Sequence, residues 1–289
     1  MRTVTLEELL EAGCHFGHQV TRQNPKARDY VFEARDNIHI IDLAKTKEGL
    51  EQAAAFVKSL AAKPDSTMLV LGSKRQAEGV VSSEVKRAKD GSATGLYSVT
   101  NRWIGGIFTN FSEVSKNFKR LQDLTSNLQS EEEKAKFTKK EVSLWAKEKQ
   151  KLESFYGGIV EMRKPPDAIF VIDTHLEQMA VFEARKMGVT TIGITDTNAD
   201  PELIEYAIPA NDDAVGSIEL ILTYIIDAWI EGRKEAVKKK VSEESQGTKE
   251  TKEHPRQEAD QKQESGRESS KKEVEVKSKK AKGKNTTKK

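Results

Sequence analysis

Short apolar runs alternate with amphipathic stretches along most of the chain. Runs of four to six residues that are rich in β-branched side chains are typical of buried β-strands. The predicted strands are 38–43, 68–72, 168–172 and 189–194. Apolar residues at helical spacing predict a helix over 45–62 and a final helix over about 213–232. A further helix is expected from the pattern at 73–76 to about 89, and another between the last two strands. This alternation predicts an α/β fold with a parallel sheet and crossover helices.

Three short patterns of Ser or Thr followed three residues later by Glu or Gln predict helix starts near Thr5, Ser73 and Thr174. Gly13 is placed to end the first of these helices. Residues 14–35 are basic and polar with little periodicity, so we expect an extended surface segment there.

The pattern changes over residues 110–160. Two stretches carry apolar residues at heptad-like steps, and a charged connector over about 131–138 separates them. Ser130 and Thr138 supply helix-start patterns for the return arm. We therefore expect two antiparallel helices packed as a coiled-coil hairpin, inserted in the α/β domain and free to grip a partner.

Composition divides the chain near residue 232. Residues 233–289 contain no Phe, Trp or Tyr, and carry 19 Lys and Arg against 11 Asp and Glu, a net charge of +8. This composition predicts a disordered, lysine-rich tail after a folded domain over 1–232. Because the whole chain has a net charge of +2, the domain alone is at −6. Any binding of nucleic acid by the domain must therefore use local basic clusters.

The single cysteine and the lack of an apolar signal region predict a cytoplasmic protein. Cys14 is the only cysteine, so no intrachain disulfide can form. No apolar signal region follows Met1, and the most apolar stretch, 218–230, contains Glu219 and Asp227 and is too short to span a bilayer.

Carboxylates gather after two of the predicted strands, where an α/β enzyme would hold its chemistry. An α/β hydrolase or phosphotransferase using the acids around Asp196 and Asp212 is one interpretation. No phosphate-binding glycine motif accompanies these acids. The alternative, which we favour, is that they are turn and helix-cap residues. This structural set is Asp196, Asn198, Asn211, Asp212 and Asp213.

Cys14, His15 and His18 are metal-ligand types, but a structural zinc site needs four ligands and the chain has no second cysteine. We expect no metal and no cofactor. Contact with RNA, or packing alone, explains these residues better.

Several basic clusters could contact phosphate. Lys74 and Arg75 lie at a predicted helix start, where backbone amides also favour anions. Arg102 and Trp103 precede Gly105 and Gly106, so a cation and a stacking face adjoin a backbone that a partner can approach closely. A core position is the alternative for the tryptophan, and a solvated face is the alternative for each basic cluster.

The motifs together resemble the bacterial-type small-subunit ribosomal protein S-two family. They appear in family order from Thr5 to about Trp229. The matching stretches are 9–13 with 15–18, 24–26, 38–43, 72–77, 102–106, 109–111, 166–167 with 171–173, 196–198, and 209 with 211–213.

The resemblance implies a flavodoxin-like domain and a non-catalytic, structural role in the small ribosomal subunit of a bacterium or an organelle. It implies two partners, small-subunit ribosomal RNA and neighbouring ribosomal proteins, among them the large mRNA-binding first protein. A free RNA-binding regulator is the alternative with the same basic clusters. The expected RNA-binding residues are His15, His18, Arg22, Asn24, Lys26, Lys74, Arg75, Arg102, Trp103, Asn110, Lys116, Lys119 and Arg120.

Overall fold

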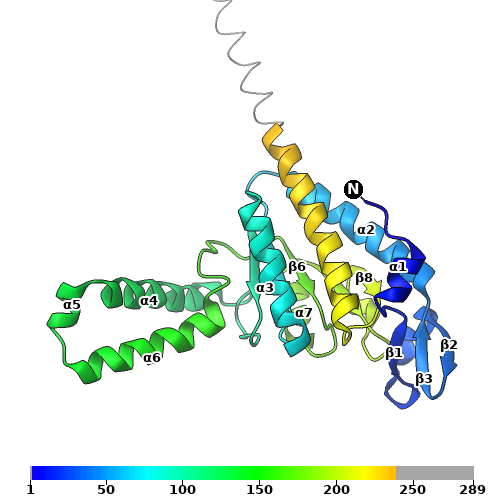
Figure 1. Cartoon of the computed structure of the whole chain (residues 1–289), viewed down its shortest axis with the longest axis horizontal. Coiled ribbons are helices and arrows are strands. Elements are labelled where there is room, and N and C mark those ends of the chain that lie inside the picture. The colour runs from blue at the N-terminus through cyan, green and yellow to red at the C-terminus, as the bar shows by residue number, and fades with distance from the viewer. Residues whose placement is uncertain (1, 239–289) are drawn as a thin grey trace, which may run out of the picture. The chain divides into compact units, whose positions relative to one another are not determined.

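A five-stranded parallel sheet forms the centre of the computed structural model, which describes residues 2–238 (Figure 1). Its spatial order is β5-β4-β6-β7-β8, which is 2-1-3-4-5 when these strands are counted along the chain. This is the strand order of flavodoxin-like folds. The strands are β4 (Met68–Leu71), β5 (Leu96–Val99), β6 (Ala168–Val171), β7 (Thr190–Thr195) and β8 (Tyr206–Pro209).

Both faces of the sheet are covered, which explains why β4 and β6 are apolar at every position. Met68 and Val70 of β4 belong to one hydrophobic core, and Leu69 and Leu71 belong to the other. Alternate side chains of a strand point to opposite faces, so a strand buried on both sides needs apolar residues throughout. The predicted parallel α/β sheet is confirmed.

Helices on either side of the sheet form the two cores. Buried residues of α2, α3 and the helix that begins at residue 215 line the first core. Buried residues of α7 and of the start of α4 line the second. These helices and the short first helix are α1 (Leu6–Glu11), α2 (Leu43–Ala61), α3 (Arg75–Asp90), α4 (Phe111–Gln129) and α7 (Gln178–Lys186).

The helix-start patterns divide into correct and incorrect ones. Thr5 forms a complete capping box with Glu8, as predicted. The pattern at Ser73 does not cap a helix, because the Ser73 hydroxyl donates to Glu177 and Lys74 is the residue that precedes α3. The pattern at Thr174 is also wrong. The Thr174 hydroxyl donates to the Ile194 carbonyl 3.1 Å away, and α7 begins only at Gln178.

Residues 14–35 fold differently from the extended segment that the sequence predicts. They supply two strands of a small antiparallel sheet with the order β1-β3-β2. Asp36 and Asn37 have positive φ angles of 49° and 66° at the turn between β2 and β3, the conformation that tight two-residue hairpins require. The elements of this region are β1 (Phe16–Gln19), η1 (Val20–Arg22), η2 (Pro25–Tyr30), β2 (Val31–Arg35) and β3 (Ile38–Ile41).

Residues 110–160 form α4, then the short α5 (Glu131–Ala135) and α6 (Lys139–Tyr156), and α4 and α6 run side by side (Figure 1). The Arg120 guanidinium donates to Glu148 at 2.9 Å across the pair. Ser130 and Thr138 accept hydrogen bonds from backbone amides at the starts of α5 and α6, as predicted. The coiled-coil packing of these helices stays a prediction.

The last helix begins at residue 215 and reaches the end of the described residues. The predicted packing residues of this helix are buried, Trp229 among them. Arg233 is also buried, and its guanidinium donates to the carbonyls of Thr94 at 2.9 Å, Lys63 at 3.1 Å, and Ser66. The guanidinium also lies 4.8 Å from the centre of the Trp229 ring. The domain boundary at 232 stays a prediction, and the disordered tail predicted beyond it lies, from residue 239, outside the described residues.

We predict that Arg233→Ala lowers the free energy of unfolding by about 1–3 kcal/mol, because it leaves these carbonyls without their donor. Urea denaturation of the full chain measures this change. Lys234→Ala, at the exposed neighbouring position, is the control. Equal stability of the two variants would contradict the structural role of Arg233.

Candidate functional site at the carboxyl edge of the parallel sheet

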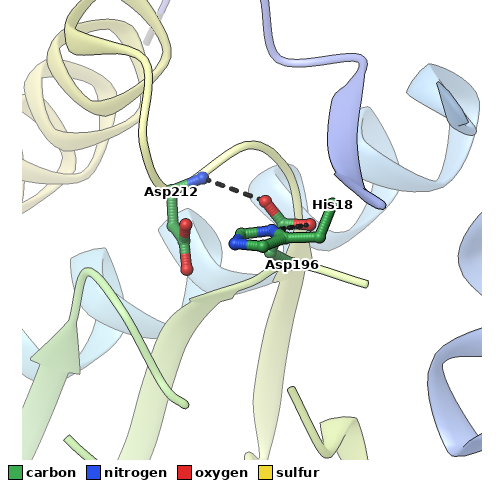
Figure 2. A group of neighbouring side chains, drawn as sticks. All are labelled: His18, Asp196 and Asp212. Carbon is green, nitrogen blue, oxygen red and sulfur yellow. Dashed lines mark hydrogen bonds and ion pairs between the residues drawn. The ribbon is translucent and has the colours of Figure 1, made fainter. Parts of the chain in front are cut away.

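Charged side chains meet where four strands of the parallel sheet end. Lys74 follows β4, Asp173 follows β6, Asp196 follows β7 and Asp212 follows β8. The carboxyl ends of parallel strands share one edge of the sheet, so these residues come together although the chain separates them widely. His18 reaches the same place from β1 of the small sheet (Figure 2).

Lys74 is the centre of the charge pairing. Its ammonium lies 2.8 Å from Asp173, 2.7 Å from Asp212 and 2.8 Å from Asp213. Burial acts to lower the pKa of Lys74, but the carboxylates outweigh burial and raise it. An ammonium has three N–H donors, so one carboxylate for each leaves no donor free for a phosphate.

His18 joins the small sheet to the edge of the parallel sheet. Its Nδ1 lies 3.2 Å from an oxygen of Asp196, and its Nε2 lies 3.6 Å from Asp213. The hydrogen bond with Asp196 raises the pKa of His18 against the effect of burial. Gly17 makes this approach possible, because a Cβ there would lie 2.8 Å from the Thr197 side chain.

Asp212 is the most enclosed acid of the group. Its side chain has 0% exposure, and within residues 2–238 only one of its two oxygens has a partner, which is Lys74 at 2.7 Å. Burial first, and then the charges of Asp173 and Asp196, raise the pKa of Asp212 to about 8. The acids around Lys74 therefore oppose one another, and the lysine only partly offsets their repulsion.

Only some of the residues that we expected to cap helices or stabilise turns do so. Asn211 accepts hydrogen bonds from the amides of Asp213 at 2.8 Å and Ala214 at 3.1 Å, just before the helix that begins at residue 215. Asp212 makes no such bond and is an ion-pair partner instead, because its carboxylate points to Lys74. Asp196 accepts from Thr197 within a turn, whereas the buried side-chain oxygen of Asn198 has no hydrogen-bond partner among the described residues.

Trp103 is a core residue. Its side chain is 8% exposed and belongs to the second core, and its ring centre lies 5.2 Å from that of Phe108. Its indole nitrogen donates to Glu183 at 3.4 Å, and Glu183 also accepts from the amide of Gly106 at 2.9 Å. The ring therefore presents no open stacking face.

Other predicted RNA contacts are already paired within the chain. Lys26 lies 2.9 Å from Asp200, Lys116 lies 2.7 Å from Glu113, and Arg120 binds Glu148. The Asn24 side chain accepts from the Lys26 amide at 3.0 Å, and the ring of His15 lies 4.0 Å from that of Phe16. Asn110 precedes α4 and is exposed, but its side chain does not cap that helix.

A smaller group of predicted cations remains open to solvent. Within residues 2–238, the side chains of Arg75, Arg102 and Lys119 are exposed and take part in no salt bridge or side-chain hydrogen bond. Arg22 is exposed too, and its only described charge interaction is with Asp213. These side chains are the strongest candidates for contact with an external anion.

Sequence patterns point to only part of this site. The acids at the strand ends are recognisable, but the pairing of Lys74 with three of them is not, because a lysine at a helix start suits phosphate equally well. Glu183 has no local signal at all, since it lies in the middle of α7 and acts on a loop 77 residues earlier in the chain.

The fold and the site together define a flavodoxin-like α/β protein whose strand-end crevice is filled by its own ion pairs. A family model described as ribosomal protein S2 matches residues 9–232. The match covers more than half of the 289 residues, and the chain belongs to this family. The family is one of structural, non-enzymatic proteins of the small ribosomal subunit. No helix within residues 2–238 has the length and apolar character needed to cross a bilayer.

We predict that Lys74→Ala lowers the free energy of unfolding by about 3–5 kcal/mol, because it leaves three clustered carboxylates without their counter-ion. Lys86→Ala, at an exposed position of the same helix, should change it by less than about 0.5 kcal/mol. Urea denaturation compares the two variants, and equal values would rule out the structural role of Lys74.

The free energy of unfolding should fall as the pH rises from 6 to 9. The pKa values of His18 and Asp212 are both raised in the folded state, so each group binds its proton more tightly there than in the unfolded chain. The stability that each contributes is complete below its unfolded pKa, 6.5 for His18 and 3.8 for Asp212, and is lost as the pH passes the folded value. The decline is at most about 1.4 kcal/mol per pH unit for each proton released.

Urea denaturation across this pH range in metal-free buffer measures the decline. His18→Gln and Asp212→Asn should each reduce it, while His175→Gln, at an exposed histidine, should leave it unchanged. A decline that neither site variant alters would show that other groups cause it.

Proposed function

We propose that the chain binds small-subunit ribosomal RNA through Arg75, Arg102 and the groups near them. The observation that carries this proposal is that both guanidinium groups are exposed and unpaired within residues 2–238 and follow neighbouring strands. Leu71, the last residue of β4, is aligned with Val99, the last residue of β5. The two arginines, three or four residues further on, thus leave the same edge of the sheet from adjacent strands.

The amino end of α3 adds a second kind of anion-binding group to the surface formed by Arg75 and Arg102. The side chain of Lys74, the residue before α3, makes no cap hydrogen bond, and Arg75 is the first residue of the helix. The first amides of a helix lack partners within it, and the helix dipole favours negative charge there. A phosphate placed at this end would meet both backbone N–H groups and a guanidinium.

Paired residues hold this surface in place. Lys74 is engaged by Asp173, Asp212 and Asp213, so we assign it to fixing the chain just before Arg75. Trp103 packs in the core directly after Arg102 and sets the course of that loop. In this proposal neither residue touches RNA, and His18 acts by joining β1 to the sheet edge.

The surface explains how an acidic domain can bind RNA. A domain with a net charge of −6 repels RNA as a whole, so binding needs local cations that the chain's own acids do not engage. Arg75 and Arg102 are such cations, because both side chains are exposed and unpaired within residues 2–238.

We also propose that α4 and α6 pack as a coiled coil that contacts a neighbouring ribosomal protein, the large mRNA-binding first protein among the candidates. Val114, Phe118 and Leu121 are buried at heptad-like steps of α4. Leu144 of α6 is 56% exposed and Phe137, just before α6, is 42% exposed, so apolar surface remains for a protein partner.

We predict that Arg75→Ala and Arg102→Ala each weaken binding to small-subunit ribosomal RNA. Each should reduce the slope of log affinity against log salt by about 0.7–1, the loss of one phosphate contact. Filter binding of the full chain over a range of salt concentrations measures both the affinity and the slope.

Arg163→Ala is the matched control. Arg163 is exposed, but it precedes β6 and so lies towards the opposite, amino edge of the sheet. An equal loss in all three variants would mean that general charge and not this surface binds RNA. Sedimentation with the small subunit at moderate salt tests the assembly itself, and persistent absence of the chain from that fraction would overturn the proposal.

A further inference from the structure

Three potential metal ligands converge at the carboxyl edge of the sheet. His18, Asp196 and Asp212 each offer one ligand atom, and these three atoms lie within 4.8 Å of one another (Figure 2). The residues come from β1, the end of β7 and the segment after β8, so the fold and not local sequence brings them together.

One oxygen in this group has no partner. Asp212 gives one carboxylate oxygen to Lys74, and its other oxygen is buried without a hydrogen bond among the described residues. Burying an unpaired oxygen of a charged group is costly, and a bound cation would remove that cost. This unpartnered buried oxygen distinguishes the group from an ordinary cluster of surface acids.

The negative charge around Lys74 exceeds what this one lysine can neutralise, so a second cation would be stabilised there. Four carboxylates, of Asp173, Asp196, Asp212 and Asp213, meet one ammonium, that of Lys74, so three negative charges remain when all four acids are ionised and His18 is neutral. A divalent ion would reduce this excess to one. Lys74 keeps its place on the first oxygen of Asp212 while the ion takes the second, so that the carboxylate bridges the two cations.

The imidazole is already oriented as a ligand. Nδ1 of His18 lies 3.2 Å from Asp196, and two ligands bonded to one tetrahedral Zn²⁺ lie about 3.3 Å apart, given bonds of about 2.0 Å. Nε2 lies 3.6 Å from a carboxylate oxygen of Asp213. A metal-bound histidine nearly always has a carboxylate or carbonyl near its other nitrogen.

We propose that His18, Asp196 and Asp212 bind a divalent transition-metal ion, with Zn²⁺ as the best match, and that water completes the coordination. One imidazole nitrogen and two carboxylates suit Zn²⁺ better than Mg²⁺ or Ca²⁺, which prefer oxygen ligands alone. The ion has a path from solvent, since the His18 side chain is 15% exposed and that of Asp213 is 56% exposed. Its role is structural: it ties the small antiparallel sheet to the parallel sheet.

Titration calorimetry of the metal-free full chain with Zn²⁺ tests this site. We expect one Zn²⁺ per chain, and binding at least about tenfold weaker in His18→Gln and in Asp212→Asn. His175→Gln and Asp123→Asn remove an exposed histidine and an exposed carboxylate elsewhere, and should bind as the unaltered chain does. Mg²⁺ should bind far more weakly than Zn²⁺.

A measurement on the unaltered chain guards against misfolded variants. The imidazole resonances of His18 should shift when Zn²⁺ is added, while those of His175 should not. Absence of stoichiometric Zn²⁺ binding, or equal binding by folded His18→Gln and Asp212→Asn chains, would overturn the proposal. The result is independent of RNA binding, because none of the three ligands belongs to the surface formed by Arg75 and Arg102.

Discussion

The pairing of one lysine with three carboxylates is the interaction on which the carboxyl edge of the sheet depends. In flavodoxin-like folds, ligands bind between the ends of the first and third strands, where the strand order reverses. Lys74 follows the first of these strands and Asp173 the third, and their ion pair at 2.8 Å occupies that place. The edge is thereby a fixed element of structure, in keeping with a family whose members are not enzymes.

How well each strand could be predicted follows from its surroundings. The strand 68–71 is buried on both faces and consists only of apolar residues, so its pattern is plain. By contrast, β5 (LYSV) and β8 (YAIP) contain polar or half-buried residues or a proline, and the sequence does not reveal them. The strands within 14–35 are also hidden, because β1 and β2 expose most of their side chains and show no alternation.

At the site, residue types were predictable and their partners were not. A lysine beside an arginine at a helix start suits an anion, and only the fold shows that the anions beside Lys74 are its own aspartates. Trp103 raises the same problem, because a tryptophan next to two glycines fits a stacking platform or a core position equally well. Cys14, His15 and His18 are too few to form a structural zinc site by themselves. The acids that lie near His18 are more than 170 residues away along the chain, so the sequence does not connect them with it.

The position of the last helix also has a consequence for synthesis. A ribosome makes this chain from its amino end, and Trp229 and Arg233 are among the last residues of the described part to leave it. Until they emerge, one face of the parallel sheet lacks one of the three helices that cover it, and the carbonyls of Lys63 and Ser66 lack their donor. The nascent domain therefore exposes apolar surface for nearly its whole translation, the condition in which newly made chains most need chaperones.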